Sequence, residues 1–312
     1  MCIITTETLE EERQRWLRIT KTNIFARHTR PGYQVLAYNL SIASKSVAAM
    51  ILPLPVKPDS GEEALKFIDL STYATFFNDL NFICESEYCE PESEMFDLEE
   101  ASFGSEDETE VILAVHEVGD FEASYVPTMK DFNRLDPRFR LPEEIWKKMP
   151  DYSDYGFAVF QLKITLMQDN NETENHVHPM AFEFPTRDDN RLFFPTVHVH
   201  DGDFHENAGF YHTFYCQREN ARSEFKYQRD LLHGEKPTPA EEIMGSTESE
   251  SSDYDFPFGF FGYDWYSRSL KPLSDSVDLE KCEGLLDEDK QLHSMSLFGN
   301  YPNKDIWLGD SL

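Results

Sequence analysis

Two pairs of histidines have the spacing that β-structure uses to hold a metal ion. His176 and His178 are two residues apart, and so are His198 and His200. Side chains at positions i and i+2 of a strand point to the same face, and imidazoles arranged in this way bind zinc, iron or copper. If the two strands are neighbours, four rings converge, and a nearby carboxylate orients them. The predicted metal ligands are His176, His178, His198, His200, Asp201 and His205.

A second interpretation of the same pattern needs no metal. Val197 and Val199 alternate with His198 and His200. If the valines form the buried face of a strand, the imidazoles lie on its solvent face or cap turns, and the spacing follows from the alternation alone. The two interpretations differ in geometry, because only a metal site requires the rings of both pairs to meet.

Cysteine offers a different route to catalysis. The chain has five cysteines, an odd number without zinc-finger spacing. Removal of the initiator methionine would leave Cys2 with its own α-amino group as a base, as in N-terminal amidohydrolases; the alternative is an incidental cysteine at the start of the chain. His212 and Cys216 are about 13 Å apart if both lie on one strand, too far for a hydrogen bond. We therefore predict that Cys216 is a buried structural residue.

Residues 131–140 carry a dense mixture of charges in an otherwise anionic chain. An arginine cluster of this kind can bind an anion. The alternative is a set of internal salt bridges that holds a long loop in place. The charged residues concerned are Asp131, Arg134, Asp136, Arg138 and Arg140.

Alternating apolar residues predict the strands that must position these groups. Residues 34–42 alternate in this way, and both faces are mostly apolar, which predicts a central strand. Further strands are predicted at residues 23–27, 47–54, 111–118, 121–126, 157–165, 180–184, 193–200 and 210–216. Helices are predicted at residues 8–19, 60–69, 71–80, 142–148 and 218–232. We expect an α+β fold in which a mostly antiparallel β-sheet of about seven strands is covered by a few helices.

Composition divides the chain into three parts. We expect an N-terminal helical extension over residues 1–19, a globular α+β domain over residues 20–235, and an acidic, low-complexity and largely disordered C-terminal tail over residues 236–312. Within the globular domain, residues 85–110 are dominated by Glu, Asp and Ser, which predicts an acidic mobile insertion.

The net charge of −31 at pH 7 limits the partners. Nucleic-acid binding depends on Lys and Arg that displace phosphate counterions, and an anionic membrane repels such a chain, so we expect neither partner. A cation or a basic protein partner suits this charge. No stretch approaches about 18 consecutive apolar residues, and the N-terminus lacks a signal pattern. We expect a soluble, cytoplasmic protein.

Several stretches resemble a group of uncharacterised bacterial proteins with no assigned activity. They are residues 50–58 (MILPLPVKP), 67–80 (FIDLSTYATFFNDL), 124–142 (SYVPTMKDFNRLDPRFRLP), 156–163 (GFAVFQLK) and 178–202 (HPMAFEFPTRDDNRLFFPTVHVHDG). Members of the group often begin with Met-Cys and contain an IFAR stretch, here residues 24–27. The resemblance covers residues 20–217, agrees with the domain boundary and implies no catalytic residue. The N-terminal helix predicted here departs from the shorter Met-Cys starts and weakens a role for Cys2.

These observations lead to three hypotheses. The first is a soluble metal-binding protein or metalloenzyme that holds a divalent transition metal, zinc or iron, in the histidine cluster. The alternative is a non-catalytic acidic protein that binds a basic protein partner. A second alternative is an N-terminal Cys amidohydrolase.

Overall fold

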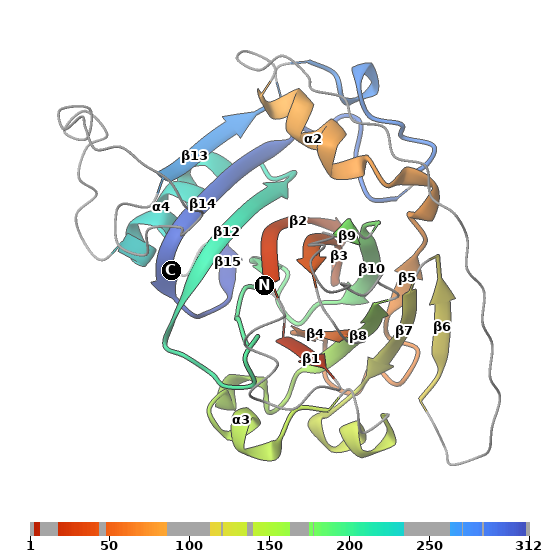
Figure 1. Ribbon diagram of the computed structural model, residues 1–312. Helices are drawn as coiled ribbons and strands as arrows, with labels where there is room; N and C mark the ends of the chain where they lie inside the picture. Colours follow the sequence, from red (N-terminus) through yellow and green to blue (C-terminus); the bar gives the residue numbers. More distant parts are fainter. Residues whose placement is uncertain are drawn as a thin grey trace, which may run out of the picture.

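The computed structural model describes residues 3–6, 18–43, 48–85, 113–119, 121–135, 140–162, 175–176, 178–233, 263–269, 271–282 and 284–309. Their strands form two large sheets and one short two-stranded sheet (Figure 1). Helices are few, and the expected mixed fold with mostly antiparallel strands is confirmed.

The larger sheet has eight strands in the described part of the chain. Its spatial order is β13 (Tyr263–Arg268), β14 (His293–Pro302), β12 (Asn207–Cys216), β2 (Arg18–Arg30), β3 (Tyr33–Ala43), β10 (Met180–Pro185) and β5 (Lys66–Ile68), and the short β9 (Asn175–His176) pairs with β3. Among these described strands, β12 and β2 are the one parallel pair. The central strands thus join segments that are far apart in sequence.

The smaller sheet has five described strands, all antiparallel. Its order is β1 (Ile3–Thr6), β4 (Ala48–Leu54), β8 (Gly156–Leu162), β7 (Phe121–Val126) and β6 (Val115–Val118). The strands predicted at residues 111–118 and 121–126 correspond to β6 and β7, which pair as a hairpin. A third sheet pairs β11 (Leu192–Phe194) with β15 (Ile306–Leu308).

Both faces of each large sheet are buried, because successive residues of the central strands pack into different cores. In β3, Leu36 belongs to the main core, whereas its neighbour Val35 belongs to a second core on the opposite face. Met50 and Ile51 of β4 are divided between the main core and a third core in the same way. All four side chains are buried. Burial of each contributes about 1.5–3 kcal/mol, which explains why these strands are apolar at nearly every position.

Two helices cover opposite faces of the larger sheet (Figure 1). Phe76 of α2 (Phe76–Glu85) packs edge-on against Phe25, with ring centroids 6.2 Å apart. Phe225 of α4 (Ala221–His233) lies in the main core on the other face. A short helix, α3 (Glu143–Lys147), covers the smaller sheet. No helix in the described ranges is both long and apolar enough to cross a bilayer. The 3-10 turns are η1 (Ser71–Tyr73), η2 (Met129–Arg134), η4 (Pro150–Tyr152) and η6 (Leu273–Asp275).

The helix predicted at residues 60–69 is wrong, because these residues form a turn followed by β5. Asp59 has φ of 60° and Gly61 has φ of 79°, and neither value is compatible with a right-handed helix. The hydroxyl of Ser60 donates to the carbonyl of Lys57 at 2.6 Å and closes the turn instead of capping a helix.

The N-terminal helical extension predicted over residues 1–19 is wrong, because the described residues at both ends of this range lie in strands. Ile3 and Ile4 are buried in β1, which pairs with β4, and β2 already begins at Arg18. Two adjacent isoleucines suit an edge strand that is covered on both faces better than a charged surface helix. Residues 7–17 lie outside the described part of the chain.

The disordered tail predicted over residues 236–312 needs correction for residues 263–308. These residues form β13, β14 and β15, and β14 lies inside the larger sheet between β13 and β12. Met295 and Leu297 of β14 are buried, so the alternation was present but was masked by the surrounding acidic composition. Residues 234–262 are outside the described residues, as are residues 86–112, which hold nearly all of the acidic insertion predicted at residues 85–110.

Candidate functional site

The segment that carries His198 and His200 is extended, but it is not the regular strand predicted at residues 193–200. β11 ends at Phe194, and Val199 forms one isolated bridge to β1, in which the amide of Ile4 donates to the Val199 carbonyl at 2.9 Å. Asn303 fixes the backbone of His198 from the other side. The His198 amide donates to Asn303 Oδ1 at 2.6 Å, and Asn303 Nδ2 donates to the His198 carbonyl at 2.9 Å.

Asp305 anchors the same segment just before the histidines. Its Oδ1 accepts from the amides of Thr196 and Val197 at 2.7 and 3.3 Å, and its Oδ2 accepts from the hydroxyl of Tyr152 at 2.7 Å. Burial raises the pKa of Asp305 to about 6, although these donors favour the charged carboxylate. The connection between β14 and β15 therefore positions the histidine segment.

The imidazoles of this segment stack with other rings. His198 lies 5.0 Å from His200 and 5.0 Å from His212 of β12, measured between ring centroids. Its ring is also stacked on Phe210 at 4.9 Å with an interplanar angle of 25°. His212 continues the series towards Phe214 at 5.8 Å. The arrangement is a row of flat rings, and His212 is a member that the predicted ligand set did not contain.

Burial keeps the two inner imidazoles neutral. It lowers the pKa of His198 and of His212 well below the ordinary value. A neutral imidazole can bind a metal, but it also packs as an aromatic ring. Within the ranges that the structure describes, no group of three or more His, Cys, Asp or Glu side chains is arranged to hold a metal ion. Packing is therefore the role that the observed contacts support.

The other predicted ligands lie in different surroundings. His178 is buried against Phe121 of β7, with ring centroids 4.3 Å apart, and its Nδ1 is 3.1 Å from the carbonyl of Pro179. His205 is exposed, with Nε2 2.7 Å from Asp201 Oδ2. The backbone of His176 lies in β9 opposite Ser41. The structure thus brings together His198 with His200, and Asp201 with His205, but the expected meeting of both histidine pairs is not found among the described side chains.

The described thiols are buried. Cys84, Cys216 and Cys282 are free and buried. Burial raises the pKa of Cys216 far above its ordinary value and raises the pKa of Cys282 to about 12, so both are thiols at neutral pH. The structural role predicted for Cys216 is confirmed, since it belongs to the main core. Cys2 and Cys89 lie outside the described residues.

The arginines of residues 131–140 are engaged inside the molecule. Arg134 donates to both carboxylate oxygens of Glu62 at 2.7 and 3.1 Å and lies 3.4 Å from Asp131. Arg140 donates to the backbone carbonyls of Leu135 and Asn133, at 2.6 and 2.7 Å. Of the two interpretations, the contacts favour internal bonding over an anion site. Asp136 and Arg138 are outside the described residues.

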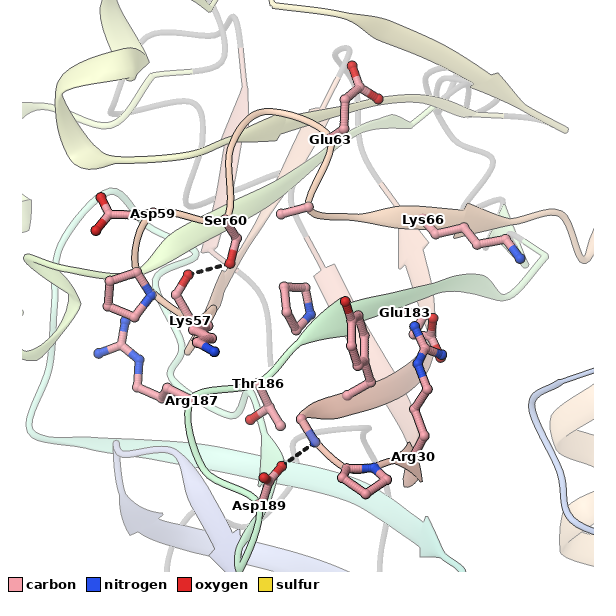
Figure 2. A pocket seen from close by; sticks show the side chains of 16 residues that line it. Arg30, Lys57, Asp59, Ser60, Glu63, Lys66, Glu183, Thr186, Arg187 and Asp189 are labelled. Carbon is pink, nitrogen blue, oxygen red and sulfur yellow. Dashed lines mark hydrogen bonds and ion pairs between the residues drawn. The ribbon is translucent and has the colours of Figure 1, made fainter.

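Sequence patterns did not indicate a charged cleft on the surface of the described part of the chain. This surface cleft has a volume of about 850 Å³ (Figure 2). Its walls are the β2–β3 turn, the loop of residues 57–64 and the end of β10. The charged residues that line it are Arg30, Lys57, Asp59, Glu63, Lys66, Glu183, Arg187 and Asp189. Four cations thus face four carboxylates, whereas the chain as a whole has 28 Lys and Arg against 59 Asp and Glu.

Two of the four cations in the cleft are held in fixed positions. The Arg30 guanidinium bonds Glu183 at 2.7 Å and lies 3.6 Å from the centroid of the Tyr33 ring. Arg187 is held by Asp154, with its Nη1 2.8 Å from the Asp154 carboxylate and its Nη2 2.6 Å from the Asp154 carbonyl.

The other two cations, Lys57 and Lys66, form no ion pair with the described residues (Figure 2). The cleft can therefore bind a polar, extended ligand through charge and hydrogen bonds. The sequence signals present were the turn residues Pro31-Gly32 and Pro58-Asp59, which mark loops but not the space between them.

No family model matches the chain, so the resemblance to bacterial proteins stays a prediction. Among solved structures, baculovirus P35 is similar with a TM-score of 0.45 and 10% identity, over 94% of this chain and 97% of that chain. A mutated baculovirus P35 after caspase cleavage is similar with a TM-score of 0.42 and 11% identity, over 93% of this chain and 99% of that chain. A chain of the caspase-8/P35 complex is similar with a TM-score of 0.38 and 10% identity, over 93% of this chain and 96% of that chain.

Proposed function

We propose that this protein is a non-catalytic binding protein whose ligand is a protein with a basic surface. One contrast carries the proposal. The histidines and cysteines that could do chemistry are mainly packed into the cores, whereas the cleft of Figure 2 is open, polar and lined by charged side chains. A site of this kind binds and orients a ligand, but it lacks the pairing of a nucleophile with a base that covalent catalysis needs.

The charge of the chain favours a basic partner. Of its net charge of −31, a large share comes from residues 86–112, which contain eleven Asp and Glu and no Lys or Arg. This acidic segment lies between α2 and β6, so both of its ends join the described part of the chain. A strong field of one sign accelerates encounter with a partner of opposite sign and discourages partners of like sign.

Association rates measured at two salt concentrations test this proposal. The full chain is immobilised, and purified proteins with pI above about 9 and below about 6 are passed over it at 50 and 300 mM NaCl. We expect saturable binding of at least one basic protein, with an association rate that falls about tenfold at the higher salt, because the Debye length shrinks from about 14 to about 6 Å.

A matched variant distinguishes electrostatic attraction by residues 86–112 from non-specific adsorption of basic proteins. In this variant the eleven carboxylates of residues 86–112 are replaced by their amides, Glu by Gln and Asp by Asn. The association rate of the basic partner should fall severalfold, while the dissociation rate changes less. Binding that is equally fast at both salt concentrations, or equally fast in the variant, would contradict the proposal.

A further inference from the structure

A second opening lies where the edges of the two large sheets meet. β5 is the last strand of the larger sheet and β6 is the last strand of the smaller one, and their Cα atoms come within 8 Å of each other. The space between them, here called the β5–β6 groove, has a volume of about 450 Å³. Its main lining residues are Glu63, Leu65, Phe67, Asp69, Glu117 and Val118. The groove shares Glu63 and Lys66 with the cleft of Figure 2, so the two openings adjoin each other at these residues.

The floor of the β5–β6 groove is apolar. Leu65 and Val118 are both only 7% exposed. The half-buried ring of Phe67 packs against the same core as these two residues, and its centroid is 5.7 Å from that of Phe160. The ring of His116 contacts the same phenylalanine at 5.3 Å. These contacts hold the aromatic face in place, so it offers a fixed surface to a ligand.

The rim of the groove is acidic. Glu63, Asp69 and Glu117 are exposed, and one lysine, Lys66, opposes these three carboxylates. Glu63 and Glu117 form no hydrogen bond or ion pair with the described residues, and Asp69 uses only Oδ1, which accepts from the amide of Ser71 at 2.8 Å. Carboxylate oxygens thus remain available around an apolar floor.

A long basic side chain matches this combination. Arg and Lys place an aliphatic stem on apolar surface and keep the charged head among polar groups. An arginine also gains from lying over an aromatic ring such as Phe67 and from bidentate contact with carboxylates. An acidic side chain meets three carboxylates here, and an apolar one leaves them without a counter-charge.

The groove is also bordered by free strand edges. In the described part of the chain, β5 pairs with β10 alone and β6 with β7 alone. Each edge strand leaves half of its backbone N–H and C=O groups without a ladder partner. Since one ladder spacing is about 4.8 Å, a third strand needs almost 10 Å between its neighbours. A third strand therefore does not fit where Cα atoms of β5 and β6 lie within 8 Å of each other, whereas Lys66 of β5 also lines the cleft of Figure 2.

We propose that the β5–β6 groove is the specificity site for an arginine or lysine in an extended segment of the protein partner. The inference rests on the proposed function, in which that partner is basic. The basic side chain occupies the groove between Leu65, Phe67 and the acidic rim, and the backbone of the segment runs beside β5 into the cleft of Figure 2. Charge complementarity decides the occupant, because the rim has three carboxylates against one lysine.

The test uses the full chain and a fluorescein-labelled ten-residue probe made of Thr and Val with one central Arg, followed by fluorescence anisotropy. The groove variant is Glu63→Gln with Glu117→Gln. The control variant, Glu143→Gln with Glu144→Gln, removes the same charge from exposed positions of α3. We expect the groove variant to bind the probe about tenfold more weakly and the control variant to bind it within about twofold of the native chain.

Two altered probes identify the recognised group. Norleucine in place of Arg keeps the stem and removes the charge, and it should abolish binding. N-methylation of alternate probe residues removes backbone donors, and it should weaken binding severalfold if the segment pairs with the edge of β5. Equal losses in the groove and control variants would overturn the groove assignment, as would a native chain that does not bind the probe. Either outcome leaves the proposed function standing, because that function is judged by salt-dependent association with an intact basic protein.

Discussion

Replacing Asp305 by Asn should change how the stability of the protein depends on pH. Asp305 accepts hydrogen bonds from the amides of Thr196 and Val197 and from the hydroxyl of Tyr152, and burial raises its pKa from an ordinary 3.8 to about 6. The folded protein therefore holds this proton more tightly than the unfolded chain does. The contribution of Asp305 to stability is present below pH 3.8 and is lost as the pH rises through about 6.

The pKa difference sets the size of the effect. At 1.36 kcal/mol per pKa unit, a change from 3.8 to about 6 corresponds to about 3 kcal/mol. Asp305 keeps some exposed surface, so solvent screening reduces this figure, and we expect about 1–3 kcal/mol. The Asn side chain has nearly the same shape and stays neutral. Its oxygen still accepts from the two amides, and the hydroxyl of Tyr152 can turn to accept from the new amide group.

Urea unfolding monitored by tryptophan fluorescence measures this prediction. At pH 7.5 the Asp305→Asn variant should be more stable than the native chain by about 1–3 kcal/mol, and the gap should narrow as the pH falls. About half of the change in this stability difference occurs between pH 5 and 7.5. This range lies above the sequence pI of about 4.5, so the chain keeps a net negative charge throughout. A difference that is constant over this range would refute the reasoning.

Asp305→Ala is the matched control. It removes the titrating group and also leaves two buried amides and one hydroxyl without an acceptor. Each lost acceptor costs about 1–3 kcal/mol, so this variant should be less stable than the native chain at every pH. If Asp305→Ala lowers the stability and Asp305→Asn raises it in a pH-dependent way, the change in stability is due to the charge of Asp305 and not to its volume.

Two further outcomes follow from the packing. Gly309 has φ of 129°, and a Cβ there would meet a backbone carbonyl of the neighbouring loop, so Gly309→Ala should destabilise the protein by about 2–4 kcal/mol in thermal unfolding. Gly32→Ala is the control, because Gly32 also has a positive φ, of 79°, but no atom lies within 4 Å of the added Cβ. This variant should lose about 1–2 kcal/mol of stability. Equal losses of stability in the two variants would show that the close contact at Gly309 has no effect. Elemental analysis should find the same sub-stoichiometric transition-metal content in the native chain and in a His198→Ala/His200→Ala variant, because the described rings stack in a row. One metal ion per native chain, lost in the variant, would restore the metal hypothesis.

Local patterns predicted much of the fold. The alternating residues 34–42 lie in β3, the apolar run at residues 47–54 corresponds to β4, and the pattern at residues 218–232 corresponds to α4. These predictions succeeded because burial of one or both faces follows directly from which residues are apolar. The sequence Ser60-Gly61-Glu62-Glu63 resembles a helix start with a Ser cap, but residues 59–61 form a turn, and only the backbone angles distinguish the two.

The histidine cluster shows where local patterns stop being informative. The pairing of His198 with His200 was visible in the sequence, but the third ring comes from His212 on β12, and the segment is held by Asn303 and Asp305, about a hundred residues away. Whether spaced imidazoles meet a metal or other rings depends on these distant contacts. The β5–β6 groove is similar, because it exists only where the last strands of two separate sheets approach each other.

The amino-acid sequence by itself determined the strand-rich α+β class, the position of most strands and the strongly negative charge, because these properties depend on residue type and on spacing over a few positions. The tertiary structure decided that β13 and β14 join the larger sheet, that His198 and His212 are buried as neutral rings, and that a charged cleft and an acid-rimmed groove open at the sheet edges. The physical reason is that strand pairing and burial join residues far apart in the chain, and the protonation state and accessibility of a side chain follow from those neighbours.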